Sequence, residues 1–272
     1  MIILNGKKLA NKILNKLKKE VKKMPVLPTG RPPIKLVVVL VGKNPASLNF
    51  IKQKQKAAEK IGIDFKLYKF NLKINTQNFL REISKIIKDK SVTGIVIQLP
   101  LPTHIDLQKV LNLLPKNMDV DALSVDNYFV EPPIVSGIIK LLEEYKIGMK
   151  GKKIVIVGQG KLVGKPLAKT LKQAGLNLKT YDIRTKNLGN KTLEADILIS
   201  ATGQPHLIKE SMVKKGAVVI DAGFAKINNK IVGDVDSENV KKRAGYITPV
   251  PGGVGPMTVA ILMSNLIKLA KK

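Results

Sequence analysis

Three glycines in the stretch VIVGQGKLVGKP have the type and spacing of a phosphate-binding turn. Gly158, Gly160 and Gly164 follow the apolar run 154–157 and open a segment with helical periodicity. Because glycine has no Cβ, the backbone of such a turn can approach a pyrophosphate lying over the amino end of the helix. Asp182 stands at the end of the next predicted strand, about 20 residues on, where a carboxylate accepts hydrogen bonds from a ribose 2′-hydroxyl. The pattern indicates a dinucleotide-binding turn; a helix-packing turn without a ligand is the alternative.

The residue types at this turn also bear on which dinucleotide is bound. The Asp182 carboxylate suits a free 2′-hydroxyl and repels a 2′-phosphate, which favours NAD. Arg184, two residues later, can pair with a phosphate. The sequence therefore favours NAD and leaves NADP open.

The turn requires a strand before it and a helix after it, and the surrounding sequence provides this alternation. In the first half, periodicity predicts helices over 8–24, 46–61, 76–89 and 106–114 and strands over 34–42, 64–70 and 93–100, with the proline-rich segment 25–33 ending the first helix. From residue 151, a strand, the glycine turn, a helix and a strand are followed by β-branched runs at 195–203, 217–223 and 244–250 and by a last helix over 258–270. Strands alternating with helices indicate an α/β fold with parallel sheets, and 272 residues favour two domains that divide near 140–150.

Composition argues against several kinds of chemistry. The chain has no cysteine and two histidines. Disulfides, thiolate nucleophiles and cysteine-ligated metals are excluded, and histidines are too few for a histidine-built metal site. We therefore expect no metal centre.

The strong positive charge allows a nucleic-acid interpretation, which the distribution of lysines disfavours. Lysine and arginine number 48 against 20 acidic residues, a net charge of +28. The lysines occur along nearly the whole chain at helix-like spacings, and aromatic residues for base stacking amount to 4%. We expect a solvated basic surface that attracts anionic small molecules, and no nucleic-acid partner. No long apolar run or signal peptide is found, so we expect a cytoplasmic protein without a membrane partner.

Several quoted stretches together resemble one family. They are NPASLNFIKQKQKAAEKIGI, GIVIQLPLP, DVDA, VGKP, GDVD and TPVPGGVGPMT, in order between residues 2 and 270. The chain resembles the methylenetetrahydrofolate dehydrogenase/methenyltetrahydrofolate cyclohydrolase family, and its most specific element is the segment 248–258.

The resemblance implies a fold, a reaction and an assembly. The fold is an α/β domain over 1–145, joined by the C-terminal helix 256–272, and a Rossmann domain over 146–255, with the folate in the cleft between them. Hydride passes from 5,10-methylenetetrahydrofolate to a nicotinamide dinucleotide, and water then opens the methenyl product to 10-formyltetrahydrofolate, a step of one-carbon metabolism that serves purine biosynthesis. Members usually form homodimers through their Rossmann domains.

The resemblance also implies three catalytic side chains. Lys54 matches the family's catalytic lysine, Gln98 the glutamine that hydrogen-bonds it, and Asp121 the aspartate that holds the amino-pyrimidine edge of the pterin. A partly desolvated lysine can exchange protons near neutrality, which suits moving the proton of the attacking water, and a carboxylate accepts two N–H donors. Without the resemblance, we would expect Lys54 to be a solvated surface residue, Gln98 to cap the backbone at a strand end and Asp121 to stabilise a loop. Asp119 is expected to be a turn or helix-end residue.

The remaining site residues follow from the same resemblance. The substrate side is expected to comprise Phe50, Leu99, Pro100, Pro251, Gly252 and Gly253. The cofactor side is expected to comprise Gly158, Gln159, Gly160, Val163, Gly164, Pro166, Asp182, Arg184, Ala201, Thr202, Gly203, Phe224 and Thr258.

The chain departs from the family pattern at informative positions. Phe50 stands where the family has a tyrosine, so the ring can stack on the folate while the hydroxyl near Lys54 is missing. The family's GRS is GQG at 158–160, and its His-Ser is Asp182 and Ile183. The changes at 158–160 and at 182–183 both remove groups that suit a 2′-phosphate, which again favours NAD.

Three hypotheses from different classes remain. The favoured one is a working dehydrogenase with cyclohydrolase activity; a monofunctional NAD-dependent dehydrogenase with weak or no cyclohydrolase is its closest alternative. The second is a non-catalytic dinucleotide-binding homologue, and the third is a nucleic-acid binder using the basic surface. Retention of Lys54, Gln98 and Asp121 together favours the first.

Overall fold

The computed structural model describes residues 1–25, 34–124, 129–228 and 230–271. The predicted turn over 25–33 therefore lies, from residue 26 on, outside the described residues. The chain forms two compact units, Met1–Ala10 with Ile134–Thr258 and Asn11–Pro133 with Val259–Lys272. We call these the six-stranded unit and the three-stranded unit after their main sheets. The domain boundaries at 145/146 and 255/256 stay a prediction.

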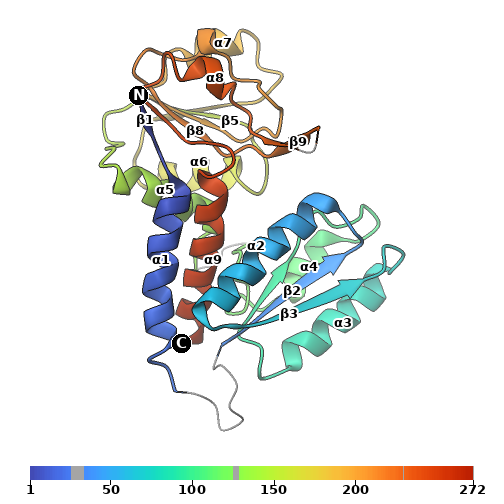
Figure 1. Cartoon of the computed structure of the whole chain (residues 1–272). Coiled ribbons are helices and arrows are strands. Elements are labelled where there is room, and N and C mark those ends of the chain that lie inside the picture. Colours follow the sequence, from blue (N-terminus) through green and yellow to red (C-terminus); the bar gives the residue numbers. More distant parts are fainter. Residues whose placement is uncertain (26–33, 125–128, 229, 272) are drawn as a thin grey trace. The chain divides into compact units, whose positions relative to one another are not determined.

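The three-stranded unit is a parallel sheet with helices on both faces (Figure 1). Its strands β2 (Lys35–Val41), β3 (Asp64–Phe70) and β4 (Gly94–Ile97) lie in the order β3-β2-β4. Helix α2 (Pro45–Ile61) lies on one face, and α3 (Thr76–Lys88) and α4 (Leu107–Leu113) lie on the other. The predicted strands and helices of this half are confirmed to within a few residues.

The central strand explains why this sheet is covered on both sides. Six of the seven residues of β2, KLVVVLV, are buried. A continuous apolar run without alternation is typical of a parallel strand that is buried on both faces. The side chains of Val37 and Val39 pack in one cluster with Phe79 and Ile83 of α3, and the ring of Phe79 meets that of Phe70 edge-on at 5.5 Å.

Helix α2, which carries Lys54, is fixed at both ends. Asn44 caps its amino end by accepting a hydrogen bond from the backbone N–H of Ser47, with Pro45 at the first helical position. Gly62 ends it with φ of 84°, a left-handed conformation that glycine adopts without strain.

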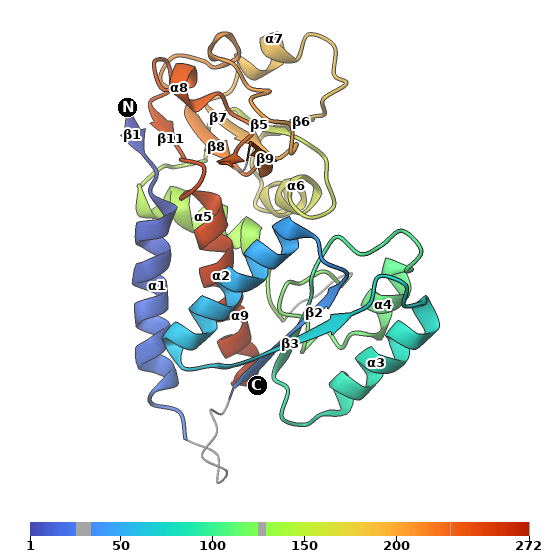
Figure 2. The ribbon, with the colours of Figure 1, turned by 45° about the vertical axis from the view of Figure 1, so that its right-hand side comes forward.

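The C-terminal helix α9 (Val254–Ala270) returns to the three-stranded unit from Val259 on, as expected. It lies beside α1 (Gly6–Val21) in both Figures 1 and 2. The buried Asn265 Nδ2 donates to the carbonyl oxygens of Val120 and Glu131, at 3.0 and 2.9 Å. These bonds attach the helix to the chain on either side of residues 125–128.

The six-stranded unit is an all-parallel sheet of Rossmann type. Its order is β1-β11-β8-β7-β5-β6, formed by β1 (Ile2–Ile3), β5 (Ile154–Val157), β6 (Leu178–Tyr181), β7 (Ile197–Ser200), β8 (Val218–Asp221) and β11 (Tyr246–Ile247). Strands β6 and β7 lie on opposite sides of β5, so the strand order reverses there, and ligands of such sheets bind at the carboxyl ends of the strands next to this reversal.

Shorter elements complete this unit. The helices are α5 (Pro133–Glu144), α6 (Gly164–Gln173), α7 (Leu188–Thr192) and α8 (Ser237–Val240), with a 3₁₀ turn η1 (Glu210–Met212) and an antiparallel hairpin of β9 (Ala225–Ile227) and β10 (Lys230–Val232). Neither β1 nor the hairpin is predicted by the periodicity, because segments of two or three residues are too short to show an alternation.

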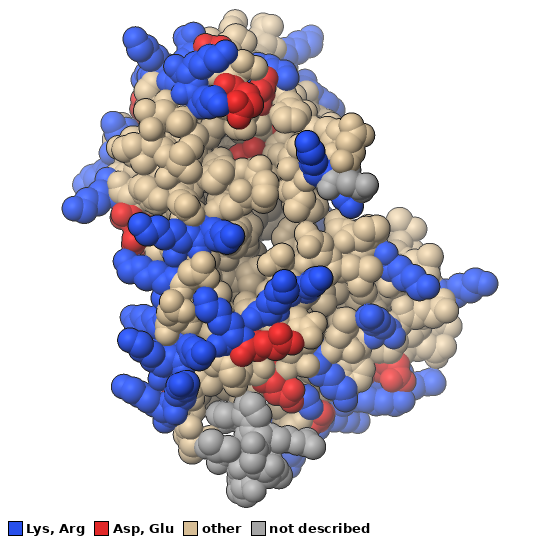
Figure 3. All heavy atoms as spheres, in the orientation of Figure 1, with Lys and Arg blue, Asp and Glu red and all other residues tan. Residues whose placement is uncertain are grey.

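Basic side chains are spread over the face shown in Figure 3 and are densest over α1. Helix α1 has lysines between the buried residues Leu9, Leu14, Leu17 and Val21. This is the amphipathic pattern of a solvated helix face. Among the described residues, no helix combines the length and apolarity that crossing a bilayer requires.

Candidate functional site

The structure brings together the three side chains that were predicted to be catalytic. All belong to the three-stranded unit: Lys54 to α2, Gln98 to the residue after β4, and Asp121 to the loop beyond α4. Lys54 Nζ donates to Gln98 Oε1 at 3.2 Å and lies 3.7 Å from Asp121 Oδ2. Lys54 is 7% and Gln98 8% exposed, and the Asp121 side chain is 18% exposed. Lys54 is thus not a solvated surface lysine.

The end of β4 fixes the orientation of the glutamine. The backbone N–H of Gln98 donates to the carbonyl of Val39 at 2.9 Å and extends the sheet by one residue. Its side-chain amide Nε2 donates to the carbonyl of Leu99 at 2.9 Å, which leaves Oε1 to accept from Lys54. Ser47 Oγ donates to the same carbonyl at 3.2 Å and connects this strand end to α2.

The two aspartates of DVDA have separate surroundings. Asp119 is 1% exposed, and its Oδ2 accepts the backbone N–H of Ser124 at 2.7 Å, in keeping with a turn residue. Burial raises the pKa of Asp121, the Lys54 ammonium opposes this rise, and the negative charge of Asp119 adds to it. The Lys54 ammonium therefore compensates in part for the hydration that the Asp121 carboxylate loses on burial.

The predicted substrate residues are divided between the units. Phe50 lies one turn before Lys54 on α2, and Leu99 and Pro100 directly follow Gln98. Pro251, Gly252 and Gly253 belong to the six-stranded unit, between β11 and α9, where Gly252 has φ of 118° and its carbonyl accepts the N–H of Lys7 at 2.8 Å.

Two glycines of the predicted phosphate-binding turn are required by close contacts. Gly158 follows β5 with φ of 107°, and a Cβ added to it would lie 2.3 Å from the carbonyl oxygen of Ala201. A Cβ on Gly164, the first residue of α6, would lie 1.9 Å from the carbonyl oxygen of Gly158. A Cβ on Gly160 would meet none of the described residues within 4 Å. The turn therefore packs tightly at its two ends and is open at its middle.

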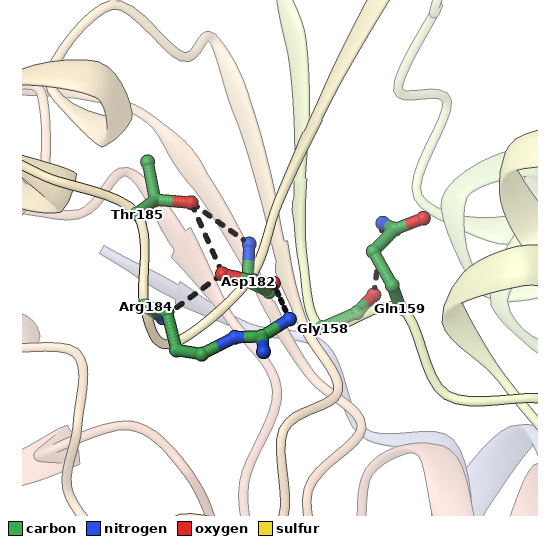
Figure 4. A network of polar contacts seen from close by, with 5 residues as sticks. All are labelled: Gly158, Gln159, Asp182, Arg184 and Thr185. Carbon is green, nitrogen blue, oxygen red and sulfur yellow. Dashed lines mark hydrogen bonds and ion pairs between the residues drawn. The ribbon is translucent and has the colours of Figure 1, made fainter.

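Asp182 follows β6, beside this turn, and is already engaged by its neighbours (Figure 4). Its Oδ1 accepts the backbone N–H of Arg184 at 2.9 Å, and its Oδ2 lies 3.1 Å from Arg184 Nη2. Thr185 Oγ1 accepts the backbone N–H of Asp182 at 3.1 Å. The bond from Arg184 is the main reason why the pKa of Asp182 is lowered. The Arg184 side chain is 86% exposed, so solvent weakens this pair.

The other predicted cofactor residues follow neighbouring elements of the same unit. Gln159 lies in the turn and its Nε2 donates to the carbonyl of Gly158 at 3.1 Å. Thr258 lies near the amino end of α9, and its Oγ1 donates to the carbonyl of Val254 at 3.2 Å. Val163 and Pro166 are at the amino end of α6, Ala201, Thr202 and Gly203 follow β7, and Phe224 follows β8.

A buried polar network next to this edge of the sheet was missed by the sequence analysis. It joins Ser200 at the end of β7, Asp221 at the end of β8, Asp234 after β10 and Thr248 after β11. All four are at most 3% exposed. The available signal was an aspartate ending each of the stretches VVID and VGD, since an acid within an apolar context needs partners when it is buried.

A cavity of about 390 Å³ lies at the opposite, amino-terminal edge of the same sheet. Its lining includes Lys146, Lys152, Lys214, Asp196 and Tyr246, and none of the residues predicted to bind substrate or cofactor. Within the described ranges, no group of three or more His, Cys, Asp or Glu side chains is arranged to hold a metal ion.

The parallel sheet, its strand-order reversal and the glycine turn at the carboxyl end of β5 define a dinucleotide-binding protein of Rossmann type. Two family models match consecutive parts of the chain: tetrahydrofolate dehydrogenase/cyclohydrolase, catalytic domain, over residues 4–121, and tetrahydrofolate dehydrogenase/cyclohydrolase, NAD(P)-binding domain, over residues 132–272. The chain belongs to the tetrahydrofolate dehydrogenase/cyclohydrolase family. The resemblance seen in the sequence and the predicted fold class are confirmed.

Full-length relatives agree with this assignment. The bifunctional protein FolD of Hydrogenobaculum sp. is 44% identical over 283 aligned residues, covering 100% of this chain and 99% of the relative. The crystal structure of the bifunctional enzyme FolD from Campylobacter jejuni has a TM-score of 0.93 at 41% identity, covering 100% of this chain and 99% of that one. The FolD of Trypanosoma brucei, in complex with NADP and an inhibitor, also has a TM-score of 0.93, at 30% identity and coverages of 100% and 97%.

Proposed function

We propose that this protein oxidises 5,10-methylenetetrahydrofolate with a nicotinamide dinucleotide and then hydrolyses the 5,10-methenyl product to 10-formyltetrahydrofolate. Both activities are those of its family, and the relatives named above are bifunctional. The observation that carries the proposal is the arrangement of Lys54, Gln98 and Asp121, in which a buried ammonium lies between an amide oxygen and a carboxylate.

Lys54 acts in the hydrolytic step. Water adds to the methenyl carbon and loses a proton, and one carbon–nitrogen bond of the five-membered ring then opens as its nitrogen gains a proton. A lysine held next to the substrate can move these protons. Gln98 accepts a hydrogen bond from the ammonium and fixes its direction, because its own amide is held by the carbonyl of Leu99. Phe50 provides a ring for stacking on the folate.

Asp121 binds the folate rather than reacting with it. A carboxylate presents two oxygens that can accept two parallel N–H groups from an amino-pyrimidine edge. Asp121 Oδ2 lies 3.7 Å from Lys54 Nζ, so substrate bound by this carboxylate is held close to the lysine. Asp119 contributes indirectly by holding the loop that presents Asp121.

The dehydrogenase step uses the six-stranded unit, since residues 132–272 are the family's NAD(P)-binding domain. A bound nicotinamide supplies the hydride acceptor. Gly158 and Gly164 keep the turn close enough for backbone N–H groups to bind the pyrophosphate, and the amino end of α6 favours its negative charge.

Within the same proposal, NAD is preferred to NADP. The Asp182 carboxylate is fixed by the backbone N–H of Arg184 and repels a 2′-phosphate. Arg184 is the group that would permit NADP, because its exposed guanidinium can leave Asp182 at little cost. The cofactor preference is therefore set by the balance between these two residues.

The same proposal covers domains, assembly and location. The folate domain comprises residues 1–145 and 256–272, and the dinucleotide domain comprises residues 146–255. Two copies of the chain pair through their dinucleotide domains. The protein is cytoplasmic. The two matched family models, over 4–121 and 132–272, support a division into a folate part and a dinucleotide part. The pairing rests on the resemblance seen in the sequence. Light scattering after size-exclusion chromatography should give about twice the chain mass of 29.8 kDa, and a mass of one chain would refute the pairing.

The activity assay follows two absorbances with methylenetetrahydrofolate and each dinucleotide in turn. We expect reduced nicotinamide to appear faster with NAD than with NADP, and the methenyl product to be consumed afterwards. Hydride transfer without consumption of the methenyl product would mean a monofunctional dehydrogenase, with Phe50 as the reason. Dinucleotide binding without hydride transfer would instead refute the enzymatic function.

A further inference from the structure

Two buried carboxylates of the six-stranded unit have no part in the proposed reaction. Asp221 ends β8, and Asp234 lies two residues beyond β10; they are 3% and 0% exposed. Strands β7, β8 and β11 are neighbours in the sheet, and the network of these two aspartates spans their carboxyl ends. Burying a carboxylate is costly unless hydrogen bonds compensate for its lost hydration, so the bonds of each oxygen are informative.

One oxygen of Asp234 holds the loop that follows β7. Its Oδ2 accepts the hydroxyl of Ser200 at 2.8 Å and the backbone N–H of Thr202 at 2.6 Å. The other oxygen, Oδ1, has no hydrogen-bond partner within the described part of the chain and lies where a Cβ of Gly223 would be, 1.9 Å from it. The carboxylate is therefore pressed against Gly223 on one side and bound to the loop on the other.

The loop held by Asp234 is in direct contact with the glycine turn. A Cβ on Gly158 would lie 2.3 Å from the carbonyl oxygen of Ala201 and 3.1 Å from the backbone nitrogen of Thr202. The peptide between Ala201 and Thr202 thus packs on the Cα of Gly158, and its N–H is the group bound by Asp234. A shift of this peptide would change the position of the turn.

Asp221 holds Asp234 in turn. Its Oδ1 accepts the backbone N–H groups of Gly223 and Asp234, at 2.9 and 3.1 Å, and its Oδ2 accepts that of Val235 at 2.9 Å. The backbone N–H of Asp221 donates to Thr248 Oγ1 at 2.7 Å. A Cβ on Gly233 would lie 2.0 Å from Asp221 Oδ2. The Asp221 carboxylate thus leaves no space for a side chain at position 233, as the Asp234 carboxylate leaves none at position 223.

We propose that Asp234 is a positioning residue of the dinucleotide site: its carboxylate fixes the peptide between Ala201 and Thr202 against Gly158 and so sets the shape of the turn. The inference rests on the proposed function, because it presupposes that the turn binds a dinucleotide. Asp234 touches neither substrate nor cofactor in this role. It acts through Thr202, and Asp221 acts through Asp234.

The test compares Asp234→Ala with a matched control, Asp196→Ala. Asp196 precedes β7 at the opposite edge of the sheet, where it also accepts a backbone N–H, that of Lys153, at 2.9 Å, and it pairs with Lys214. The probe is reduced NAD, whose fluorescence reports binding to the full chain, and urea unfolding reports the stability of each variant. We expect Asp234→Ala to weaken dinucleotide binding about tenfold or more, since bonds to a charged acceptor are lost, and Asp196→Ala to leave it unchanged.

A second pair of measurements separates positioning from general destabilisation. With Asp234→Ala, KM for the dinucleotide should rise while kcat at saturating dinucleotide and KM for the folate stay within about twofold. Asp234→Asn keeps an oxygen acceptor for Thr202 and should restore affinity to within about threefold of the parent. If Asp234→Ala does not fold, Asp234→Ser, whose hydroxyl is too short to reach Thr202, replaces it with the same expectation.

The outcomes are distinguishable. Equal dinucleotide affinity in Asp234→Ala and the parent, or equal losses in Asp234→Ala and Asp196→Ala, would overturn the role of Asp234. A parental protein that binds no dinucleotide would instead overturn the proposed function, before any variant is compared.

Discussion

At the scale of single residues, burial separates functional candidates from a large background of the same type. Lys54 is one of 48 lysine and arginine residues, and neither its type nor its helical position distinguishes it in the sequence. In the structure it is 7% exposed and bound to Gln98, whereas Lys56 on the same helix is exposed. A buried ammonium is retained only where its partners compensate for lost hydration.

Replacing Lys54 by methionine should abolish water addition to the methenyl product while the protein still folds. Methionine has a similar length and no proton to transfer. The measurement is the decay of methenyl absorbance above the uncatalysed rate, with Lys56→Met as the control on the exposed face of α2. Hydrolysis at the parental rate in Lys54→Met would refute the assigned role.

Replacing Asp182 by serine should move cofactor preference toward NADP. The change removes the carboxylate that repels a 2′-phosphate and frees the guanidinium of Arg184, which lies 3.1 Å from it. We expect the ratio of kcat/KM for NADP to that for NAD to rise about tenfold. The reason is that repulsion between the Asp182 carboxylate and the 2′-phosphate is replaced by attraction between the Arg184 guanidinium and that phosphate. An unchanged ratio would show that Asp182 does not face the ribose.

At the scale of elements, close backbone contacts decide which features of the turn are obligatory. Gly158 has φ of 107° and packs on Ala201, and Gly164 packs on Gly158, whereas a Cβ added to Gly160 would meet none of the described residues within 4 Å. The spacing of the three glycines in the sequence does not show which of them is obligatory. Ala201, which follows β7 and is distant in the sequence, constrains Gly158, and Gly158 in turn constrains Gly164.

Gly158→Ala should therefore destabilise the protein by about 2 kcal/mol or more, through both the strained φ and the contact with Ala201. Gly160→Ala should change the free energy of unfolding by less than about 0.5 kcal/mol, because its Cβ enters open space. Urea unfolding of the two variants beside the parent gives both values. Similar losses in both would mean that the turn does not have the described conformation.

The end of β8 should make stability depend on pH. Burial raises the pKa of Asp221 to about 6 from its ordinary value of 3.8, although backbone N–H groups of Val235, Asp234 and Gly223 oppose the rise. Between these values the folded protein keeps a proton that the unfolded chain has lost. Raising the pH from about 4 to about 6 should thus lower the free energy of unfolding by up to about 3 kcal/mol from this group, with no further change above about pH 7.

Comparison of the parent with Asp221→Asn at several pH values isolates that contribution. The asparagine does not titrate, so its free energy of unfolding should fall less steeply across this range. Parallel pH profiles for the two proteins would show that the carboxyl of Asp221 does not titrate as stated.

At the scale of the whole molecule, the alternation of apolar runs and lysine-rich helices suffices to predict both parallel sheets. Strand β2 is buried on both faces, and its sequence has no polar residue after Lys35. Asp182 is predictable by its distance from the glycines. Asp234 is not, because its partners Ser200 and Thr202 come from a strand end more than thirty residues earlier, and no local periodicity marks such a bond. Strand β1 is missed since two residues carry no pattern.

The net charge of +28 should also make folding sensitive to ionic strength. Lysines spread over the surface repel one another in the compact state more than in the extended chain, and salt screens this repulsion. Raising sodium chloride from about 0.05 to about 0.5 M should increase the free energy of unfolding by about 1 kcal/mol at neutral pH. A decrease would mean that attractive ion pairs such as Lys214 with Asp196 outweigh the repulsion.

The reciprocal fit of Gly223 on Asp234 and of Gly233 on Asp221 couples two glycines and two acids on either side of the β9–β10 hairpin. No single replacement at either glycine can be accommodated without displacing the opposite carboxylate. In a saturation mutagenesis screen Gly223 and Gly233 should be tolerated only as glycine while both acids are present, whereas Gly148, whose added Cβ would meet none of the described residues within 4 Å, should accept many alternatives.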